Sequence, residues 1–183
     1  MSKRSEKTIN KLYDGFAIIL KNKPYNDITI QDILDEAKIS RSTFYSHFKT
    51  KEELLLSVIS HIFEHVFSHT LNEEKTHDFS KSSIFDYVHL ITHIFYHFRD
   101  EKELIDAIFA SESRNIFLDY MKKELDEFAS ICVSSNMLSE KQIPYELRKR
   151  QFINNFVIAL EYWQKNNYQE TPEKITDYFI KLN

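Results

Sequence analysis

The sequence predicts an all-α protein, and two observations support that prediction. Its 183 residues include only 1 Gly and 3 Pro, whereas sheets and barrels need many turns, and turns depend on these residue types. Apolar residues recur three and four positions apart along most of the chain, as they do on one face of an α-helix. A chain of this length buries roughly 70% of its unfolded surface, so its core needs no disulfides.

Composition also excludes several classes of site. A single Gly cannot supply a glycine-rich phosphate loop, and a single Cys excludes an internal disulfide and a CxxC motif. The apolar run at 16–20 is too short for a signal peptide or a membrane span. We therefore expect a cytoplasmic protein with no cofactor and no membrane partner.

The first two helices are marked by their ends. Residues 5–22 carry an amphipathic pattern that must stop before Pro24, because the residue preceding proline avoids the helical region. Thr29 is followed three residues later by Asp32, which is typical of a capping box. A short helix ending near Ala37 follows.

A tight turn at Lys38 leads into the third helix. Ser40 is a good N-terminal cap, and the apolar spacing continues to about Phe48. Thr50, with an acidic residue three positions on, resembles a second capping box and opens a long helix to about Ser68. Five more helices make about nine in all, with loops at 70–80 and 135–143. The five are predicted at 82–98, 101–109, 112–134, 144–165 and 172–182, the last capped by Thr171.

The net charge of −4 hides two halves of opposite sign. Residues 1–51 contain 10 Lys and Arg against 6 Asp and Glu, a net charge of +4, so the remaining residues carry −8. A basic module therefore precedes an acidic helical body. Only the module has the charge that a nucleic-acid partner needs.

Two short helices joined by a tight turn behind a longer helix form a helix-turn-helix pattern. In that motif the second helix enters the major groove of DNA. Phe44 and Phe48 are four residues apart and predict the inner face of this helix. The polar residues on its other faces are Arg41, Ser42, Tyr45 and Ser46. The same pattern also fits an ordinary pair of bundle helices.

The residues themselves resemble a known family. The run TFYSHFKTKEELL at 43–55, preceded by ITIQDI at 28–33 and AKIS at 37–40, is similar to the signature of TetR-family transcriptional regulators. The resemblance implies an all-α homodimer in which two N-terminal heads read a roughly palindromic DNA operator. It also implies a DNA-binding domain at 1–50 and an effector-binding and dimerisation domain at 51–183.

The resemblance assigns DNA contacts residue by residue. It places Arg41, Ser42 and Ser46 at base-reading positions, and it assigns phosphate contacts to Thr29, Thr43, Tyr45, His47 and Lys51. Lys51 also lies in the first turn of a helix, where its positive charge is unfavourable, which makes sense if the ammonium meets a phosphate. Tyr45 could instead pack in the head, and His47 could hydrogen-bond in the interior.

One departure from the family concerns the turn. The family often has Gly where this chain has Lys38. If that position is left-handed, Lys38 adopts the conformation at some energetic cost. The change leaves the contact positions untouched.

Six histidines form two ladders with a spacing of four residues. They are His61, His65 and His69 on one helix, and His89, His93 and His97 on another. Neighbours at this spacing can share a metal ion, so these are weak metal candidates, although a solvated polar strip is the preferred interpretation. The family resemblance suggests a third interpretation, in which the second of these helices borders an effector pocket. Its candidate residues are His89, His93, Tyr96 and Tyr120. Cys132 lies in an apolar stretch, which favours a buried, inert thiol over a redox sensor.

The last two helices carry many large apolar residues. In TetR-like dimers these helices pair with their mates, so we assign dimerisation to Phe152, Phe156, Leu160, Trp163, Ile175, Tyr178 and Phe179; a core within one chain is the alternative. Residues 159–179 also weakly resemble a TetR subgroup that includes activators of dihydroxyacetone kinase genes.

The predicted function is a DNA-binding regulator and not an enzyme, because a helical metalloenzyme would need a motif such as HExxH, which is absent. The preferred form is a repressor released by a small-molecule effector of unknown identity. The alternative is an activator or co-regulator whose body binds a protein partner.

Overall fold

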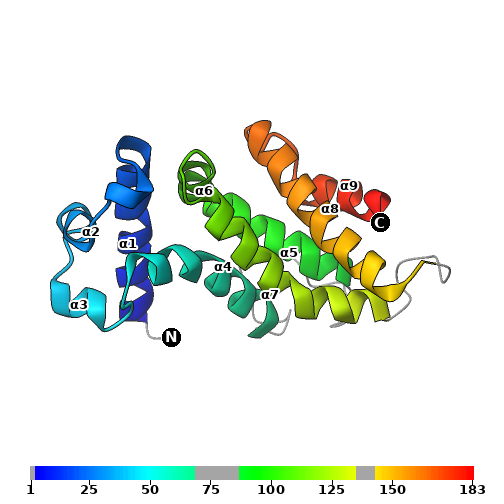
Figure 1. Cartoon of the computed structure of the whole chain (residues 1–183), viewed down its shortest axis with the longest axis horizontal. Helices are drawn as coiled ribbons and strands as arrows, with labels where there is room; N and C mark the ends of the chain where they lie inside the picture. The colour runs from blue at the N-terminus through cyan, green and yellow to red at the C-terminus, as the bar shows by residue number, and fades with distance from the viewer. Residues whose placement is uncertain (1–2, 69–86, 135–142) are drawn as a thin grey trace. The chain divides into compact units, whose positions relative to one another are not determined.

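The computed structural model describes residues 3–68, 87–134 and 143–183. Within these ranges the chain forms nine α-helices, one short 3₁₀ helix and no strand, which confirms the all-α prediction (Figure 1). The predicted loop at 70–80, the predicted helix start at 82 and nearly all of the predicted loop at 135–143 lie outside the described residues. No helix in the described ranges is long and apolar enough to cross a membrane.

The helices pack into two units, and α4 and α7 each contribute to both. The first unit comprises Met1–Val58 and Glu101–Asp119, and the second comprises Ile59–Asp100 and Tyr120–Asn183. Packing therefore places the start of α4 with the N-terminal helices. The functional boundary predicted between residues 50 and 51 stays a prediction.

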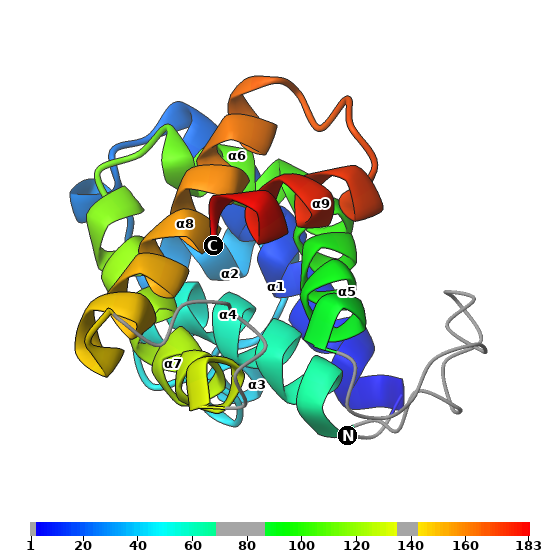
Figure 2. The ribbon, with the colours of Figure 1, turned by 90° about the vertical axis from the view of Figure 1, so that its right-hand side faces the viewer.

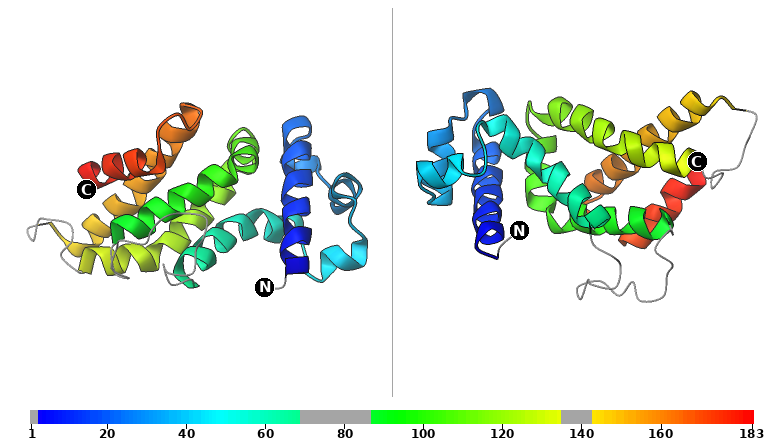
Figure 3. Two further views of the ribbon diagram at one scale, coloured as in Figure 1. Left: turned by 180° about the vertical axis from the view of Figure 1, so that it is seen from behind. Right: turned by 90° about the horizontal axis from the view of Figure 1, so that it is seen from below.

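The first unit is built around α1, with α2 packed against it and α3 following α2 (Figures 1 and 3). Its elements are α1 (Lys3–Asn22), the 3₁₀ helix η1 (Tyr25–Asp27), α2 (Ile30–Ala37), α3 (Arg41–Tyr45), the start of α4 (Lys51–Ser68), α6 (Lys102–Phe109) and the start of α7 (Arg114–Ser134). As predicted, α1 ends before Pro24. The helix predicted to reach Phe48 ends earlier, at Tyr45, and a turn follows in which the N–H groups of His47 and Phe48 both donate to the Phe44 carbonyl, at 2.9 Å.

The only glycine of the sequence lies where α1 closely approaches the end of α2. A Cβ atom added to Gly15 would lie 3.0 Å from the Ala37 backbone nitrogen and 3.1 Å from its Cα. These atoms belong to rigid helical backbone, so a side chain at this position would push the two helices apart. Gly15 thus sets the position of α2, the helix that supports α3.

The second unit has an aromatic core. It contains α5 (Tyr87–Asp100), α8 (Tyr145–Lys165) and α9 (Pro172–Leu182), together with the later parts of α4 and α7. Helix α9 packs against both α5 and α8 (Figure 2). Phe95 stacks on Phe156 with ring centroids 4.9 Å apart, and Phe152 meets Phe179 edge to face at 4.9 Å.

Candidate nucleic-acid interface and effector cavity

The turn between α2 and α3 is held by local hydrogen bonds. Thr29 caps α2 in a complete capping box with Asp32, as predicted. Lys38 has φ 55° and ψ 45°, so the left-handed position where the family often has Gly is occupied here by Lys. The Ser40 side chain accepts from the backbone N–H of Thr43 and caps α3. Caps and turn together fix the direction in which α3 leaves α2.

Helix α3 presents its polar face to solvent. Phe44 and Phe48 are buried, with 0% and 8% exposure, whereas Arg41, Ser42 and Ser46 are exposed. Tyr45 contacts Phe44 edge to face at 5.5 Å but keeps 49% of its surface exposed. The inner and outer faces predicted from the sequence are thus confirmed, and Tyr45 is only partly a packing residue. The Arg41 guanidinium donates to the Gln31 side chain at 2.9 Å.

Three of the predicted phosphate contacts are more constrained. The Thr29 hydroxyl donates to Asp32 Oδ2 at 2.8 Å and accepts the Asp32 N–H. The Thr43 hydroxyl lies 2.7 Å from Ser40 Oγ. His47 is half-buried, with its ring 6.1 Å from that of Phe48. The Thr29 hydroxyl therefore already caps α2, and the Thr43 hydroxyl already bonds the Ser40 side chain that caps α3.

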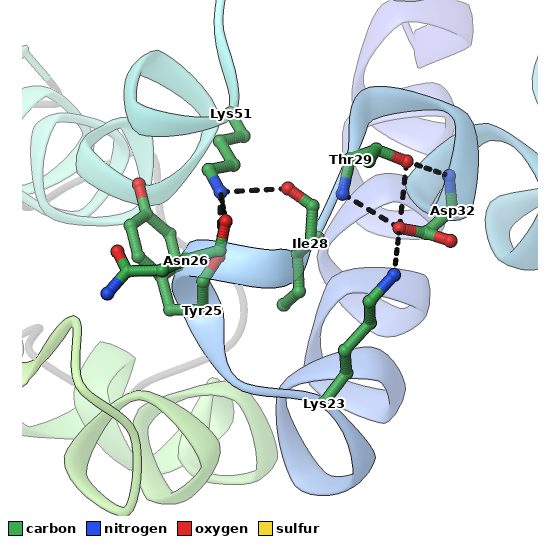
Figure 4. Close-up of polar contacts among 7 residues, drawn as sticks. All are labelled: Lys23, Tyr25, Asn26, Ile28, Thr29, Asp32 and Lys51. Atoms are coloured by element: carbon green, nitrogen blue, oxygen red, sulfur yellow. Dashed lines mark hydrogen bonds and ion pairs between the residues drawn. The ribbon is translucent and has the colours of Figure 1, made fainter.

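Lys51 occupies a place that the sequence did not predict. Its ammonium donates to the carbonyl oxygens of Tyr25, Asn26 and Ile28, at 2.7, 3.1 and 2.8 Å (Figure 4). It also lies 4.6 Å from the centroid of the Tyr25 ring. Three donors thus meet three acceptors, and the ammonium clamps the loop before α2. The phosphate contact of Lys51 stays a prediction. The unfavourable charge in the first turn of α4 is offset by these carbonyl dipoles.

An ion pair supports the same loop. Lys23 Nζ lies 2.7 Å from Asp32 Oδ2, an oxygen that also accepts from the backbone N–H of Thr29 (Figure 4). The hydrogen bond from Lys23, followed by those from Thr29, lowers the pKa of Asp32 from 3.8 to about 2. The start of α2 is therefore held by a carboxylate that stays ionised at neutral pH.

A cavity of about 560 Å³ lies in the second unit between α4 and α7. Of the predicted effector residues, only Tyr120 lines it; its hydroxyl lies 2.9 Å from Ser60 Oγ. His89, His93 and Tyr96 are not among its lining residues, and their assignment to an effector pocket stays a prediction. These three side chains lie on α5, while the cavity walls come from α4 and α7.

The polar strip of α5 is partly buried, so the preferred prediction of a solvated strip is wrong. Thr92 and His93 are 6% and 2% exposed. Thr92 Oγ1 donates to Thr176 Oγ1 of α9 at 3.0 Å, and the Tyr96 hydroxyl donates to Glu173 of α9, which raises the pKa of Tyr96. The middle of the strip is therefore buried, and the strip packs against α9, which helical periodicity alone cannot reveal.

The histidine ladders form no metal centre in the described residues. His93 and His97 lie close together, with their Nε2 atoms 3.0 Å apart, but no group of three or more His, Cys, Asp or Glu in the described ranges could hold a metal ion. His61 and His89 are half-buried. The side chain of His65 and the whole of His69 lie outside the described residues.

The residues assigned to dimerisation are largely internal. Six of them, Phe152, Phe156, Leu160, Trp163, Ile175 and Phe179, have 0% exposure in the single chain. That assignment is corrected, because side chains that already pack in the core of their own chain offer no surface to a second copy. Buried Trp163 even satisfies its indole N–H internally, by donating to the Glu170 carbonyl at 2.9 Å.

A different set of apolar residues on α8 and α9 is exposed. Ile158, Tyr162 and Leu182 keep 53%, 46% and 47% of their surface exposed. With Ala159, Ile175, Tyr178 and Lys181 they line a shallow hollow of about 360 Å³, which we name the α8–α9 face. Of the residues assigned to dimerisation, only Ile175 and Tyr178 line it. One sequence signal could have identified the α8–α9 face. Large apolar residues also occur on α8 and α9 outside the buried positions, namely Ile158, Tyr162 and Leu182.

Cys132 is buried, with 1% exposure. Burial raises the pKa of its thiol to about 12. The thiolate is the reactive form, so this environment supports the predicted inert thiol.

Known family models match both the N-terminal and the C-terminal part of the chain. A family model described as "Bacterial regulatory proteins, tetR family" matches residues 17–58. Another, described as "Transcriptional regulator C-terminal region", matches residues 86–183. The first match contains the whole α2–turn–α3 segment.

Curated relatives match over short segments. The chain is 37% identical over 71 residues to the HTH-type dhaKLM operon transcriptional activator DhaS of Lactococcus lactis, which covers 39% of this chain and 36% of that protein. It is 39% identical over 54 residues to the HTH-type transcriptional regulator YuxN of Bacillus subtilis, covering 30% of this chain and 19% of the relative. The chain thus spans well under two thirds of these relatives.

Solved structures resemble the whole chain. A TetR transcriptional regulator from Streptococcus agalactiae superposes with a TM-score of 0.67 at 24% identity, covering 98% of this chain and 95% of that one. The dihydroxyacetone kinase operon activator DhaS superposes with a TM-score of 0.55 at 18% identity, covering 96% of this chain and 93% of that one. At these identities the likeness concerns the fold.

Proposed function

Because the chain belongs to the TetR family of bacterial transcriptional regulators, we propose that it binds a roughly palindromic DNA operator as a homodimer. We further propose that a small molecule held by the second unit changes its affinity for that operator. The family consists of regulators and not enzymes, so the chain acts by binding. The proposal assigns DNA recognition to α3 and effector binding to the α4–α7 cavity.

The observation that carries the DNA-binding proposal is the outward face of α3. A short helix anchored by two buried phenylalanines presents Arg41, Ser42, Tyr45 and Ser46 to solvent. Arg reads guanine through two hydrogen bonds in the major groove, and small hydroxyl side chains contact phosphates or bases. The exposed guanidinium of Arg41 exchanges its bond to Gln31 for a base edge.

Selection of bound fragments from random double-stranded DNA tests this proposal. We expect an enriched inverted repeat. Arg41→Ala should weaken specific binding by about 1–3 kcal/mol and relax the preference at one position of each half-site. Arg150→Ala is the matched control, because Arg150 is exposed on α8. Wild-type affinity in Arg41→Ala would show that α3 is not the recognition helix.

A second copy of the chain is the proposed occupant of the α8–α9 face. A two-fold symmetric dimer is what an inverted repeat requires, and exposed contiguous apolar surface marks interaction sites. Ile158→Asp combined with Tyr162→Asp should convert the dimer to a monomer of 22.0 kDa, as measured by light scattering. Ile131→Asp is the control, because Ile131 is 63% exposed but lies outside this face.

The sign of regulation has two candidate forms. Release from the operator by a ligand makes the chain a repressor, which is our first proposal. The 37% identity to the activator DhaS over 71 residues favours the alternative, an activator or co-regulator that binds a protein partner. Deleting the gene distinguishes the two, because transcripts next to the selected operator rise for a repressor and fall for an activator.

A further inference from the structure

The α4–α7 cavity has an unusual distribution of charge. One wall is formed by Ser60, Phe63 and Glu64 of α4, and the other by Tyr120, Glu124, Glu127, Phe128 and Ile131 of α7. Three carboxylates thus line it, and no Lys, Arg or His is among these residues. Its apolar parts are two buried phenylalanines and, at the surface, Ile131 with 63% exposure.

The three carboxylates have no protein partner among the residues that the structure describes. In the described part of the chain, Glu64, Glu124 and Glu127 make neither an ion pair nor a hydrogen bond, whereas neighbouring Asp126 on α7 pairs with Lys149 at 2.6 Å. Carboxylates of one sign in a hollow with apolar walls create a negative potential that concentrates cations. The cavity is therefore electrostatically complementary to a positive ligand.

We propose that this cavity binds an organic cation with an apolar body, such as a lipophilic amine or a quaternary onium ion. The inference rests on the proposed effector-binding role of the second unit, and it names the class of effector. Its charge complements Glu64, Glu124 and Glu127, while its body contacts Phe63 and Phe128. Aromatic faces attract cations as well as apolar groups.

Two features favour an organic cation over other ligands. No group of three or more His, Cys, Asp or Glu in the described ranges converges as metal ligands do, so the three glutamates line the hollow without enclosing a bare ion. The Ser60 and Tyr120 hydroxyls lie 2.9 Å apart and bond each other, which leaves the carboxylates as the main polar groups available to a ligand. A cavity of about 560 Å³ lies in the range typical of small-molecule sites.

The test compares two ions of the same shape and opposite charge, tetraphenylphosphonium and tetraphenylborate, by calorimetry on the full chain. We expect the phosphonium to bind at least tenfold more tightly. Equal affinities, tighter binding of the borate, or no binding of the phosphonium would overturn the proposal. Because this comparison uses the unaltered protein, it does not depend on whether a variant folds.

Charge-neutralising variants test whether the phosphonium binds in the cavity. Glu124→Gln and Glu127→Gln should each weaken phosphonium binding by about threefold to tenfold, as expected for a carboxylate several ångströms from a cation in a partly hydrated site. Glu146→Gln, which removes an exposed carboxylate of α8 outside the cavity, should leave it unchanged. Equal losses in all three variants would overturn the proposed site, since they would report net charge alone.

Operator binding, measured on the same preparation without ligand, separates this inference from the proposed function. If the protein binds its operator but does not prefer the phosphonium, the ligand class is wrong and the regulator proposal stands. If the phosphonium binds in a glutamate-dependent way but operator affinity does not respond, the cation site stands and its effector role fails.

Discussion

Replacing Lys51 with Met tests the clamp at the start of α4. Methionine keeps most of the apolar stem but removes the ammonium that donates to three backbone carbonyls. Those carbonyls belong to the segment Tyr25–Ile28, which leads from α1 into α2. Their loss of a common donor should loosen the support of the helix-turn-helix head.

The structure sets the size of the effect. A hydrogen bond involving a charged group contributes about 1.5–3 kcal/mol, but these three share one ammonium, and the bond to Asn26 is the longest, at 3.1 Å, and is exposed. The Tyr25 carbonyl keeps a second donor, the Ile28 N–H at 3.2 Å. Removing a positive charge from the first turn of α4 stabilises that helix by about 0.3–1 kcal/mol, which offsets part of the loss. We expect a net loss of about 2–4 kcal/mol in the free energy of unfolding.

Urea unfolding followed by circular dichroism measures this loss. Lys49→Met is the control, because Lys49 is an exposed lysine two residues away whose side chain makes no hydrogen bond or ion pair in the described structure. It should change stability by less than about 0.5 kcal/mol. If Lys51→Met unfolds like the control and instead loses affinity for every DNA sequence alike, the clamp is incidental and the phosphate contact predicted from the sequence is correct.

Three further predictions concern single residues. Gly15→Ala should destabilise the fold by about 1–3 kcal/mol in urea, because its Cβ would meet the Ala37 backbone at 3.0 Å; unchanged stability would refute the close approach of α1 and α2. Asp32→Asn should lower the melting temperature above pH 3.8 but not near pH 2. Folding lowers the pKa of Asp32 from 3.8 to about 2, so the ionised carboxylate stabilises the fold above pH 3.8 and loses that contribution as the pH falls through 2. A difference that does not depend on pH would refute this. Cys132, whose thiol pKa is raised to about 12, should resist iodoacetamide at pH 8 in the folded protein and react in urea, and rapid labelling of the folded protein would contradict its burial.

The helix-turn-helix head was largely predictable because its signals are local. Thr29 and Asp32 satisfy the free N–H groups at the start of α2 from three residues apart, and Ser40 does the same for α3. Phe44 and Phe48 define the inner face of the third helix through their spacing alone. Such interactions need only neighbouring residues, so the sequence states them directly.

Contacts between distant segments were not predictable in the same way. The periodicity of α8 and α9 predicts large apolar faces but not what covers them, so residues such as Trp163 and Phe179 were assigned to a dimer although they fill the core of their own chain. The polar strip of α5 was assigned to solvent although His93 is buried in the fold.

The sequence predicts a helical chain, the approximate bounds of most described helices apart from the end of α3, and a basic helix-turn-helix head before an acidic body. Helix capping, periodicity and charge act over a few residues and can be read along the chain. Three features depend on tertiary packing: Lys51 clamps a loop 23 residues away, Gly15 lies close to the Ala37 backbone, and three glutamates line one cavity. Each of these depends on which helix faces lie opposite one another, and that choice is made by the packing of the whole core.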